Sequence, residues 1–262
     1  MVARCSGIGI GLPLPLQRLI GSRSRGDLAD LQKSGRVSSS PGEKTGQMTV
    51  ELHGYQYSVY SWIARLALHE KGVMHNWIEV NPFSENVPAS YLATHPFKRV
   101  PALVHNAFAV YETGAITRYV DEAFDVPKLQ PTEPRERARC NQIMSIVDSY
   151  AYWPLVRQVF SHRVFRPALR RPVEESEVER GLESAPRVLA ALETIAGQGQ
   201  YLTGEDLSLA DIHLAPMIGY FVLAPEGLAL LQKHIRLNRW WSALSGRTAL
   251  LATMPQLPQA PQ

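Results

Sequence analysis

The spacing of apolar and polar residues changes near residue 125, which predicts two domains of different build. Thr49 to His53 alternates polar and apolar side chains and stops at Gly54, a pattern typical of a strand. Apolar residues then recur at helical intervals from Ser61 to Lys71, and Gly72 is a helix-stop signal. The next segments predict a strand, a helix, two strands and a helix, at residues 77–80, 89–93, 100–104, 108–111 and 113–124.

The rest of the chain has a helical pattern throughout. A linker is marked by three prolines: Pro127, Pro131 and Pro134. A long helix follows, and Pro154 inside it is expected to bend it. Ser208 and Asp211 have the spacing of a capping box at the start of a later helix. Further helices are predicted over residues 174–196, from residue 209, and within residues 226–247.

These patterns predict an α/β domain over residues 48–125, a linker over 126–133 and an α-helical bundle domain over 134–250. We expect a disordered tail over residues 251–262, where Pro and Gln recur. We expect a disordered basic extension over residues 1–47, which hold seven Lys or Arg, three Asp or Glu and no aromatic residue. We interpret this stretch as a non-functional extension before a second start at Met48, and an organelle transit peptide, which has a similar composition, is the alternative.

Composition and charge exclude several classes of protein. Residues 48–262 hold 20 Lys or Arg and 21 Asp or Glu, so they lack the basic excess of a nucleic-acid-binding domain. No apolar run reaches the roughly 18 residues of a membrane-spanning helix. Two cysteines, Cys5 and Cys140, are too few for a disulfide scaffold, which indicates a reducing compartment and a cytoplasmic protein. The histidines show no HExxH-like spacing, so we expect no metal site.

Four segments occur in the order and spacing of a known family: residues 58–65 (SVYSWIAR), 95–103 (HPFKRVPAL), 111–113 (YET) and 208–212 (SLADI). With the predicted order of elements, they make the chain similar, over residues 49 to about 247, to the glutathione S-transferase superfamily, in its serine-type, bacterial-like class. The resemblance implies a thioredoxin-like N-terminal domain followed by an all-α helical domain. It also implies glutathione as co-substrate and a homodimer.

The resemblance assigns the glutathione site to the first domain. It implies a cis Val100–Pro101 bond, which would turn the backbone groups of Val100 toward the cysteinyl part of glutathione. Thr113, expected as the N-cap of its helix, and Glu112 would hold the carboxylate and ammonium of the γ-glutamyl group. Arg99 lies where the family often carries Gln or Lys facing the ligand's carboxylates.

The catalytic group is expected to be a hydroxyl near residue 58. A free thiol has a pKa of about 8.5, so the enzyme must favour the thiolate, and one hydroxyl donor at a helix N-terminus can do so. The resemblance places this role on Ser58, while Tyr57, Tyr60 and Ser61 remain alternatives. No cysteine occurs in this stretch, which argues against disulfide exchange and cysteine-type chemistry.

The resemblance implies that the second substrate binds against residues at the start of the first predicted helix and on the long helix after the linker. The candidates are Tyr57, Tyr60, Tyr150, Trp153 and Arg157, with Tyr152 and Phe160 on the same helix; a plain core role is the alternative for these aromatic residues. The predicted function is conjugation of glutathione to a hydrophobic electrophile. A glutathione-dependent isomerase or dehalogenase, or a non-catalytic transferase-like binding protein, are the alternatives.

Overall fold

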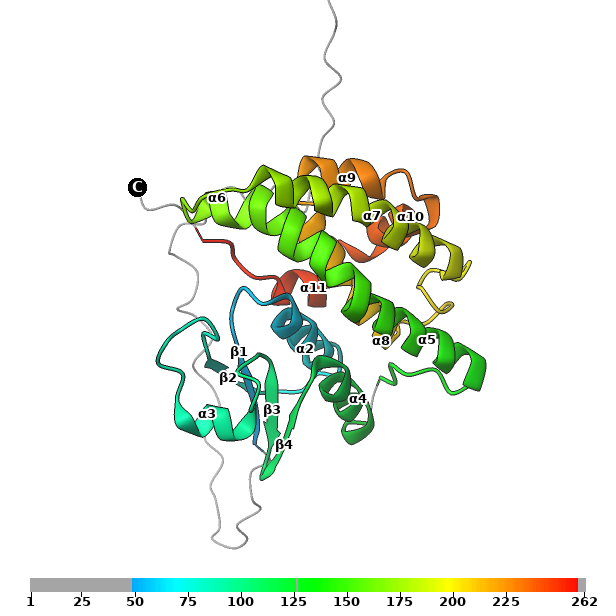
Figure 1. The fold of residues 1–262 in the computed structure, drawn as a ribbon. Coiled ribbons are helices and arrows are strands. Elements are labelled where there is room, and N and C mark those ends of the chain that lie inside the picture. The colour runs from blue at the N-terminus through cyan, green and yellow to red at the C-terminus, as the bar shows by residue number, and fades with distance from the viewer. Residues whose placement is uncertain (1–48, 126, 259–262) are drawn as a thin grey trace, which may run out of the picture. The chain divides into compact units, whose positions relative to one another are not determined.

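The computed structural model describes residues 49–125 and 127–258, so the predicted extension over residues 1–47 lies outside the described part. The first half contains a four-stranded sheet in the order β2-β1-β3-β4 (Figure 1). Its elements are β1 (Val50–Gly54), α2 (Val59–Glu70), β2 (Asn76–Glu79), α3 (Ala89–Thr94), β3 (Ala102–His105), β4 (Phe108–Tyr111) and α4 (Thr113–Ala123). Strand β1 pairs parallel with β2 and antiparallel with β3, and β3 pairs antiparallel with β4. This is the predicted thioredoxin-like order.

Buried and half-buried side chains alternate along β1, and helices cover both faces of the sheet. Leu52 of β1 is fully buried and packs in one core with residues of β3, α2 and α4. On the other face, Tyr91 of α3 packs with Ala102 and Val80. Helices α2 and α4 therefore cover one face, and α3 covers the other. Gly72 ends α2 with a φ of 64°, the left-handed conformation for which glycine is favoured.

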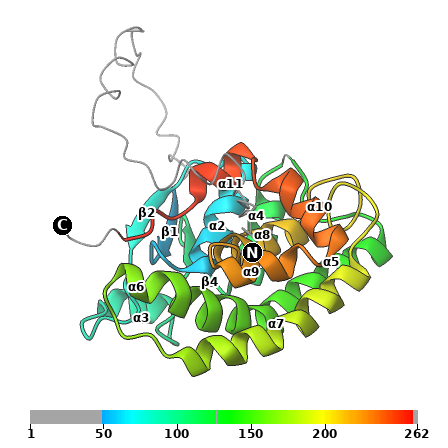
Figure 2. The same cartoon turned by 90° about the horizontal axis from the view of Figure 1, so that it is seen from above.

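The second half is helical, as predicted. It contains α5 (Pro134–Ile146), η1 (Val147–Phe165), α6 (Arg166–Ala168), α7 (Glu175–Ile195), α8 (Leu209–Phe221), α9 (Pro225–Leu231), α10 (Ile235–Leu244) and α11 (Thr248–Thr253). Helix α7 runs alongside η1 (Figure 2). The segment η1 is π-helical and continues α5, so Pro154 is accommodated inside a wider helix instead of ending it.

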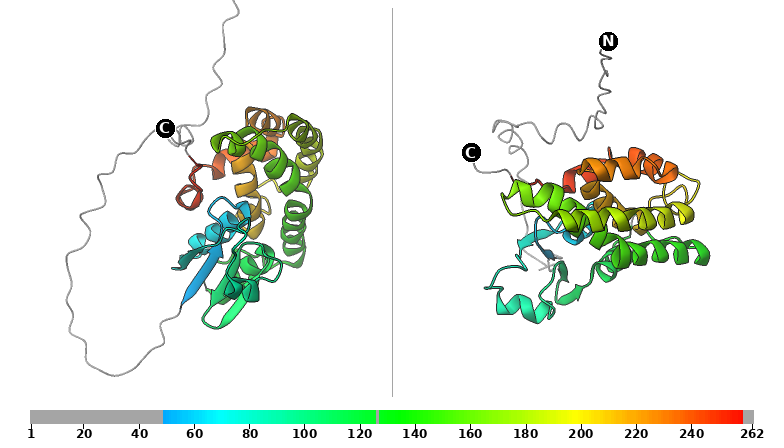
Figure 3. Two further views of the ribbon diagram at one scale, coloured as in Figure 1. Left: turned by 60° about the vertical axis from the view of Figure 1, so that its left-hand side comes forward. Right: turned by 45° about the horizontal axis from the view of Figure 1, so that its top comes forward.

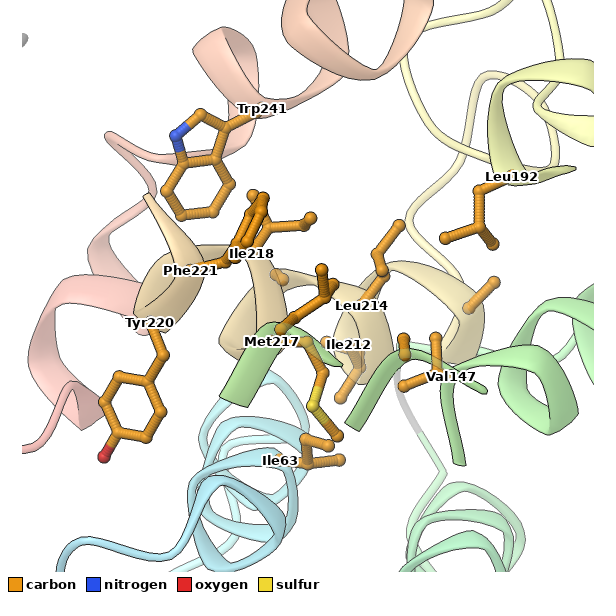
Figure 4. Close-up of a cluster of buried hydrophobic side chains, with 14 of the residues drawn as sticks. Ile63, Val147, Leu192, Ile212, Leu214, Met217, Ile218, Tyr220, Phe221 and Trp241 are labelled. Carbon is orange, nitrogen blue, oxygen red and sulfur yellow. The ribbon is translucent and has the colours of Figure 1, made fainter. Parts of the chain in front are cut away.

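Helix α8 is the centre of this half, because every one of its residues is buried. Apolar side chains gather around it from α2, η1, α7 and α10, as Figure 4 shows for Ile63, Val147, Leu192 and Trp241. Helix α8 also packs against α2 of the first domain (Figure 3). The two helices approach closely at Gly219, where a Cβ atom would lie 2.8 Å from the ring of Trp62.

The predicted capping box starts α8. The Asp211 carboxylate accepts hydrogen bonds from the N–H and hydroxyl of Ser208, from the Leu202 N–H and from the indole N–H of Trp240. Asp211 is fully buried, so these four donors replace the water that the carboxylate loses. The same carboxylate therefore fixes the helix start and joins it to α10.

The disordered tail predicted from residue 251 begins too early, because α11 continues to Thr253. The Thr253 hydroxyl is buried and accepts a hydrogen bond from the indole N–H of Trp62, at 3.1 Å. This bond spans both domains, and no local pattern indicates it. Within the described part of the chain, no helix is long and apolar enough to cross a membrane.

Candidate active site

Two serines at the start of α2 have different surroundings. Ser58 is the N-cap of α2, and its Oγ accepts a hydrogen bond from the Ser61 N–H at 3.2 Å. Its side chain is only partly buried. Ser61 is fully buried, and its hydroxyl accepts from the Tyr55 N–H at 3.2 Å. Of the two hydroxyls, that of Ser58 is the one a ligand can reach.

The predicted cis peptide bond between Val100 and Pro101 is present. The ladder between β3 and β4 begins with the pair Ala102 and Tyr111, so Val100 lies just outside it. Arg99, before it, is exposed, and its carbonyl accepts a hydrogen bond from the Tyr91 hydroxyl. The backbone at residues 99–101 therefore leads into β3 outside the ladder, with Arg99 exposed and Pro101 buried.

The start of α4 differs from the expectation that Thr113 is the N-cap. Glu112 is the N-cap, and its carbonyl accepts from the N–H groups of Ala115 and Ile116. Thr113 is the first helical residue and is buried. Glu112 has a φ of 70°, which a residue with a Cβ adopts at a cost, and such conformations concentrate at functional sites. The exposed Glu112 side chain therefore lies next to the first N–H groups of α4.

Two aromatic contacts join the start of α2 to the helical domain. The ring centroids of Tyr60 and Tyr152 lie 5.0 Å apart, and those of Tyr57 and Phe165 lie 5.2 Å apart. Tyr57 and Tyr60 are thus held at the junction between the domains, where the sequence placed the second substrate. Phe165 is not among the residues predicted from the sequence, whose aromatic candidates on this helix end at Phe160.

Charged groups surround this junction. Burial is the main cause that raises the pKa of Tyr60, and the negative charge of Asp148 adds to it, so the Tyr60 phenol stays protonated near neutral pH. Burial also raises the pKa of the Tyr152 phenol, while the cations Arg157 and Arg99 oppose that shift. Arg99 of the first domain and Arg157 of the second therefore act on the same phenol.

Asp148 also adjoins this junction, and it is not among the residues predicted from the sequence. Burial raises the pKa of its carboxyl to about 6, Arg118 opposes the shift, and the nearby Glu112 carboxylate adds to it. Its Oδ1 lies 3.9 Å from Nδ1 of His213, a fully buried residue whose Nε2 is 2.9 Å from the Thr117 hydroxyl. An acid two residues before the aromatic stretch that begins at Tyr150 was the available signal.

The remaining predicted residues separate into two groups. Tyr150 and Trp153 are 64% and 58% exposed, and the Arg157 guanidinium lies 6.0 Å from the Trp153 ring centroid. Tyr150 has no ring contact with the other aromatic residues among those described. Phe160, for which the sequence left a core role open, is 3% exposed and stacks on Tyr220 at 4.0 Å, inside the helical core.

No group of three or more His, Cys, Asp or Glu side chains suited to a metal ion occurs in residues 49–125 and 127–258. The groups described above are hydroxyls, backbone N–H groups, carboxylates and guanidinium groups. An accessible hydroxyl at a helix N-terminus can stabilise an anion, and carboxylates next to a second helix start can hold an ammonium.

Two family models match the chain. Residues 52–132 match "Glutathione S-transferase, N-terminal domain", and residues 175–241 match "Glutathione S-transferase, C-terminal domain". Glutathione S-transferase F13 of Arabidopsis thaliana is 29% identical over 221 residues, which cover 82% of this chain and 99% of the relative. Glutathione S-transferase F10 of the same plant is 31% identical over 192 residues, covering 71% and 87%.

Solved structures are similar over the same region. The apo form of glutathione S-transferase III has a TM-score of 0.71 and 24% identity, covering 82% of this chain and 99% of that one, which shows the fold. A theta class glutathione S-transferase from the citrus canker pathogen Xanthomonas axonopodis pv. citri was solved with glutathione bound. It has a TM-score of 0.67 and 26% identity, covering 79% and 97%.

Proposed function

The chain belongs to the glutathione S-transferase family and is a transferase, and we propose that it conjugates glutathione to an electrophile with Ser58 as the catalytic hydroxyl. The observation that carries the assignment of Ser58 is the access of its hydroxyl at the start of α2, in contrast to the enclosed Ser61. Tyr57 and Tyr60 are engaged in ring contacts with Phe165 and Tyr152. Glutathione is the co-substrate, and no metal takes part in this proposal.

Glutathione binds to the edge of the first domain. The backbone of Val100, outside the sheet ladder and next to the cis bond with Pro101, pairs with the cysteinyl part of glutathione. The Thr113 N–H, at the start of α4, receives the γ-glutamyl carboxylate, because helix N-termini favour anions. Glu112 pairs with the γ-glutamyl ammonium, and the exposed Arg99 pairs with a carboxylate of the ligand.

Ser58 acts on the glutathione sulfur. Its hydroxyl donates a hydrogen bond to the thiolate while its oxygen continues to accept from the Ser61 N–H, and the N-terminal dipole of α2 adds to the effect. Lowering the thiol pKa by about two units requires roughly 2.7 kcal/mol of preference for the thiolate. The thiol proton passes to solvent, and the thiolate then attacks an electrophile held between α2 and η1.

The broader context is also part of the proposal. We retain residues 48–125 as the glutathione-binding domain and the helical domain from residue 134, now extended to Thr253. A homodimer fits the large apolar side chains Phe97 and Phe108 of the first domain, which are 65% and 52% exposed. A cytoplasmic location and the serine-type, bacterial-like class remain predictions.

Two measurements test the proposed function. Retention on glutathione-agarose, with elution by free glutathione, tests binding, and thiol consumption with a panel of aryl halides, epoxides and peroxides tests turnover. We expect both to succeed. Binding without turnover of any compound would favour a non-catalytic binding protein, and absence of both would contradict the proposal.

A further inference from the structure

The π-helical geometry of η1 brings one set of side chains onto the face toward α2. Hydrogen bonds in a π-helix join residues i and i+5, so residues four and five positions apart share a face. Five residues have this spacing along η1: Asp148, Tyr152, Arg157, Ser161 and Phe165. Tyr152 and Phe165 touch Tyr60 and Tyr57 of the first domain, which shows where this face points.

The two ring contacts bracket Ser58. Ser58 lies between Tyr57 and Tyr60 in the chain, and Arg157 lies between Tyr152 and Phe165 on the facing helix. A group on this face between the two contacts therefore lies on the side of η1 that faces the residues flanking Ser58. Arg157 is exposed, and its positive charge acts on the phenol of Tyr152, whose ring contacts Tyr60.

Arg157 has no fixed anionic partner. None of the ion pairs in residues 49–125 and 127–258 includes it, whereas Arg163, further along η1, is paired with Glu175 and Glu226. The Arg157 guanidinium lies instead beside the ring of Trp153, at 6.0 Å. An unpaired guanidinium beside an aromatic ring is suited to a planar ligand with a negative charge, because the ring supplies a stacking surface and the guanidinium a bidentate donor pair.

We propose that Arg157 binds a carboxylate on the second substrate, so that the chain prefers planar aromatic electrophiles that carry a negative charge. This inference rests on the proposed function. It differs from the role of Arg99, which lies on the first domain and serves the carboxylates of glutathione. Trp153 stacks on the aromatic ring of the electrophile, and the reacting carbon lies toward Ser58.

The reaction used as a test is an aromatic substitution. The thiol of glutathione loses its proton to solvent, the thiolate sulfur forms a bond to the ring carbon that carries chlorine, and chloride leaves with the electron pair of the broken C–Cl bond. No oxidant or reductant takes part. Arg157 contacts only the carboxylate and leaves these bonds unchanged.

The test compares 4-chloro-3,5-dinitrobenzoate with its methyl ester, which has the same reacting carbon but no charge. kcat/KM is measured for the wild type, Arg157→Gln, Arg157→Lys and Arg187→Gln. The last variant removes the same charge from an exposed position on α7 and is the matched control. The ester also reports whether each variant is folded.

We expect Arg157→Gln to lower kcat/KM for the benzoate about tenfold, mainly through KM, and to leave the ester within about twofold. Arg157→Lys should keep part of the preference, and Arg187→Gln should change neither rate. Unchanged benzoate kinetics in Arg157→Gln, or equal losses on both compounds, would overturn the inference while the proposed function stood. If the wild type neither conjugated the ester nor bound glutathione, both would be wrong.

Discussion

The N–H of Ser61 donates to the hydroxyl of Ser58, at 3.2 Å, and this bond orients an accessible hydroxyl at the first turn of α2. Ser61's own hydroxyl faces inward and accepts from the backbone of Tyr55. One residue thus caps the helix and remains open to a ligand, while the other fastens the preceding loop. The two serines are chemically alike, and only their burial distinguishes their roles.

Replacing Ser58 by alanine should impair catalysis far more than glutathione binding. Val100, Glu112 and Thr113 would still hold the peptide, but the pKa of the bound thiol should rise by about one to two units. Turnover at neutral pH should then fall by roughly one to two orders of magnitude, and raising the pH should restore part of it. The measurement is the pH–rate profile with one aryl halide, together with glutathione affinity by calorimetry.

Ser61→Ala is the matched control for this experiment. It removes a buried acceptor and leaves the Tyr55 N–H unpaired, so it should cost about 1–2 kcal/mol in the free energy of unfolding. Its pH–rate profile should match that of the wild type. A shifted profile in Ser61→Ala, combined with an unchanged one in Ser58→Ala, would show that Ser61 carries the catalytic hydroxyl and that our assignment is wrong.

A buried ion pair holds the first domain to the linker. Lys71 and Asp121 are almost fully buried, with 3.3 Å between Nζ and Oδ1. Lys71 also donates to the Pro127 carbonyl, and Asp121 accepts from the N–H groups of Leu129 and Gln130. The pair therefore ties the ends of α2 and α4 to the segment that leads into the helical domain.

Asp121→Asn should lower the free energy of unfolding by about 3–5 kcal/mol, because it leaves the Lys71 ammonium buried without its counter-ion. Lys71→Met should also destabilise. The double variant should lose less than the sum of the two single losses, since neither charge is then left alone. Urea denaturation of the four proteins measures this coupling, and additive losses would show that the two residues act independently.

The elements of the fold were predictable because their signals are local. Gly72 marks the end of α2 one residue after Lys71, and Ser208 and Asp211 identify the start of α8 within four positions. The bond from Trp62 to Thr253 joins residues 191 positions apart, so no window of sequence indicates that the last helix continues past residue 250. Contacts of this range depend on the packing of α2 against the helical domain.

The site was predicted in part, and the difference has a geometric cause. An α-helical period places Phe160 two turns after Trp153 and on the same face, but η1 is wider than an α-helix. Steps of four and five residues from Tyr152 lead to Phe165 instead, and Phe160 turns into the core. Asp148 lies on the same face, one step before Tyr152. A hydrophobic pattern does not reveal a change of helical period, so Phe165 and Asp148 were missed.

Lys98→Gly should stabilise the protein slightly. Lys98 is exposed and has a φ of 52°, a conformation that costs a residue with a Cβ about 1–2 kcal/mol. Glycine removes this cost, but it increases the conformational entropy of the unfolded chain, which lowers the free energy of unfolding by about 0.4–1 kcal/mol. The net gain in the free energy of unfolding should therefore be about 0.5 kcal/mol. Lys98→Ala keeps a Cβ and should gain nothing. Thermal unfolding distinguishes them, and equal melting temperatures would contradict the prediction.

Asp148 should make the free energy of unfolding fall as the pH rises. Most carboxylates have the opposite effect. Its pKa in the folded protein is about 6, whereas an unfolded Asp titrates near 3.9. Between about pH 4 and 6 the native state therefore binds more protons than the unfolded state, so its contribution to stability falls as the pH rises. Above about pH 6 the charged carboxylate carries the full penalty.

Asp148→Asn should remove that penalty. The groups that face Asp148 are Tyr60, Glu112, Arg118 and His213. His213 stays neutral over this range, because burial lowers its pKa to about 3. At about pH 7.5 the variant should be more stable than the wild type, by no more than about 1 kcal/mol, since the Asp148 side chain is 40% exposed and solvent screens its charge. The advantage should shrink as the pH falls from about 6 to about 4.

Urea denaturation at about pH 4.5, 5.5 and 7.5 measures this change in stability, with Glu183→Gln on α7 as a control for the change in net charge. An advantage that is constant across the three pH values, or that grows toward the lowest one, would contradict the raised pKa of Asp148.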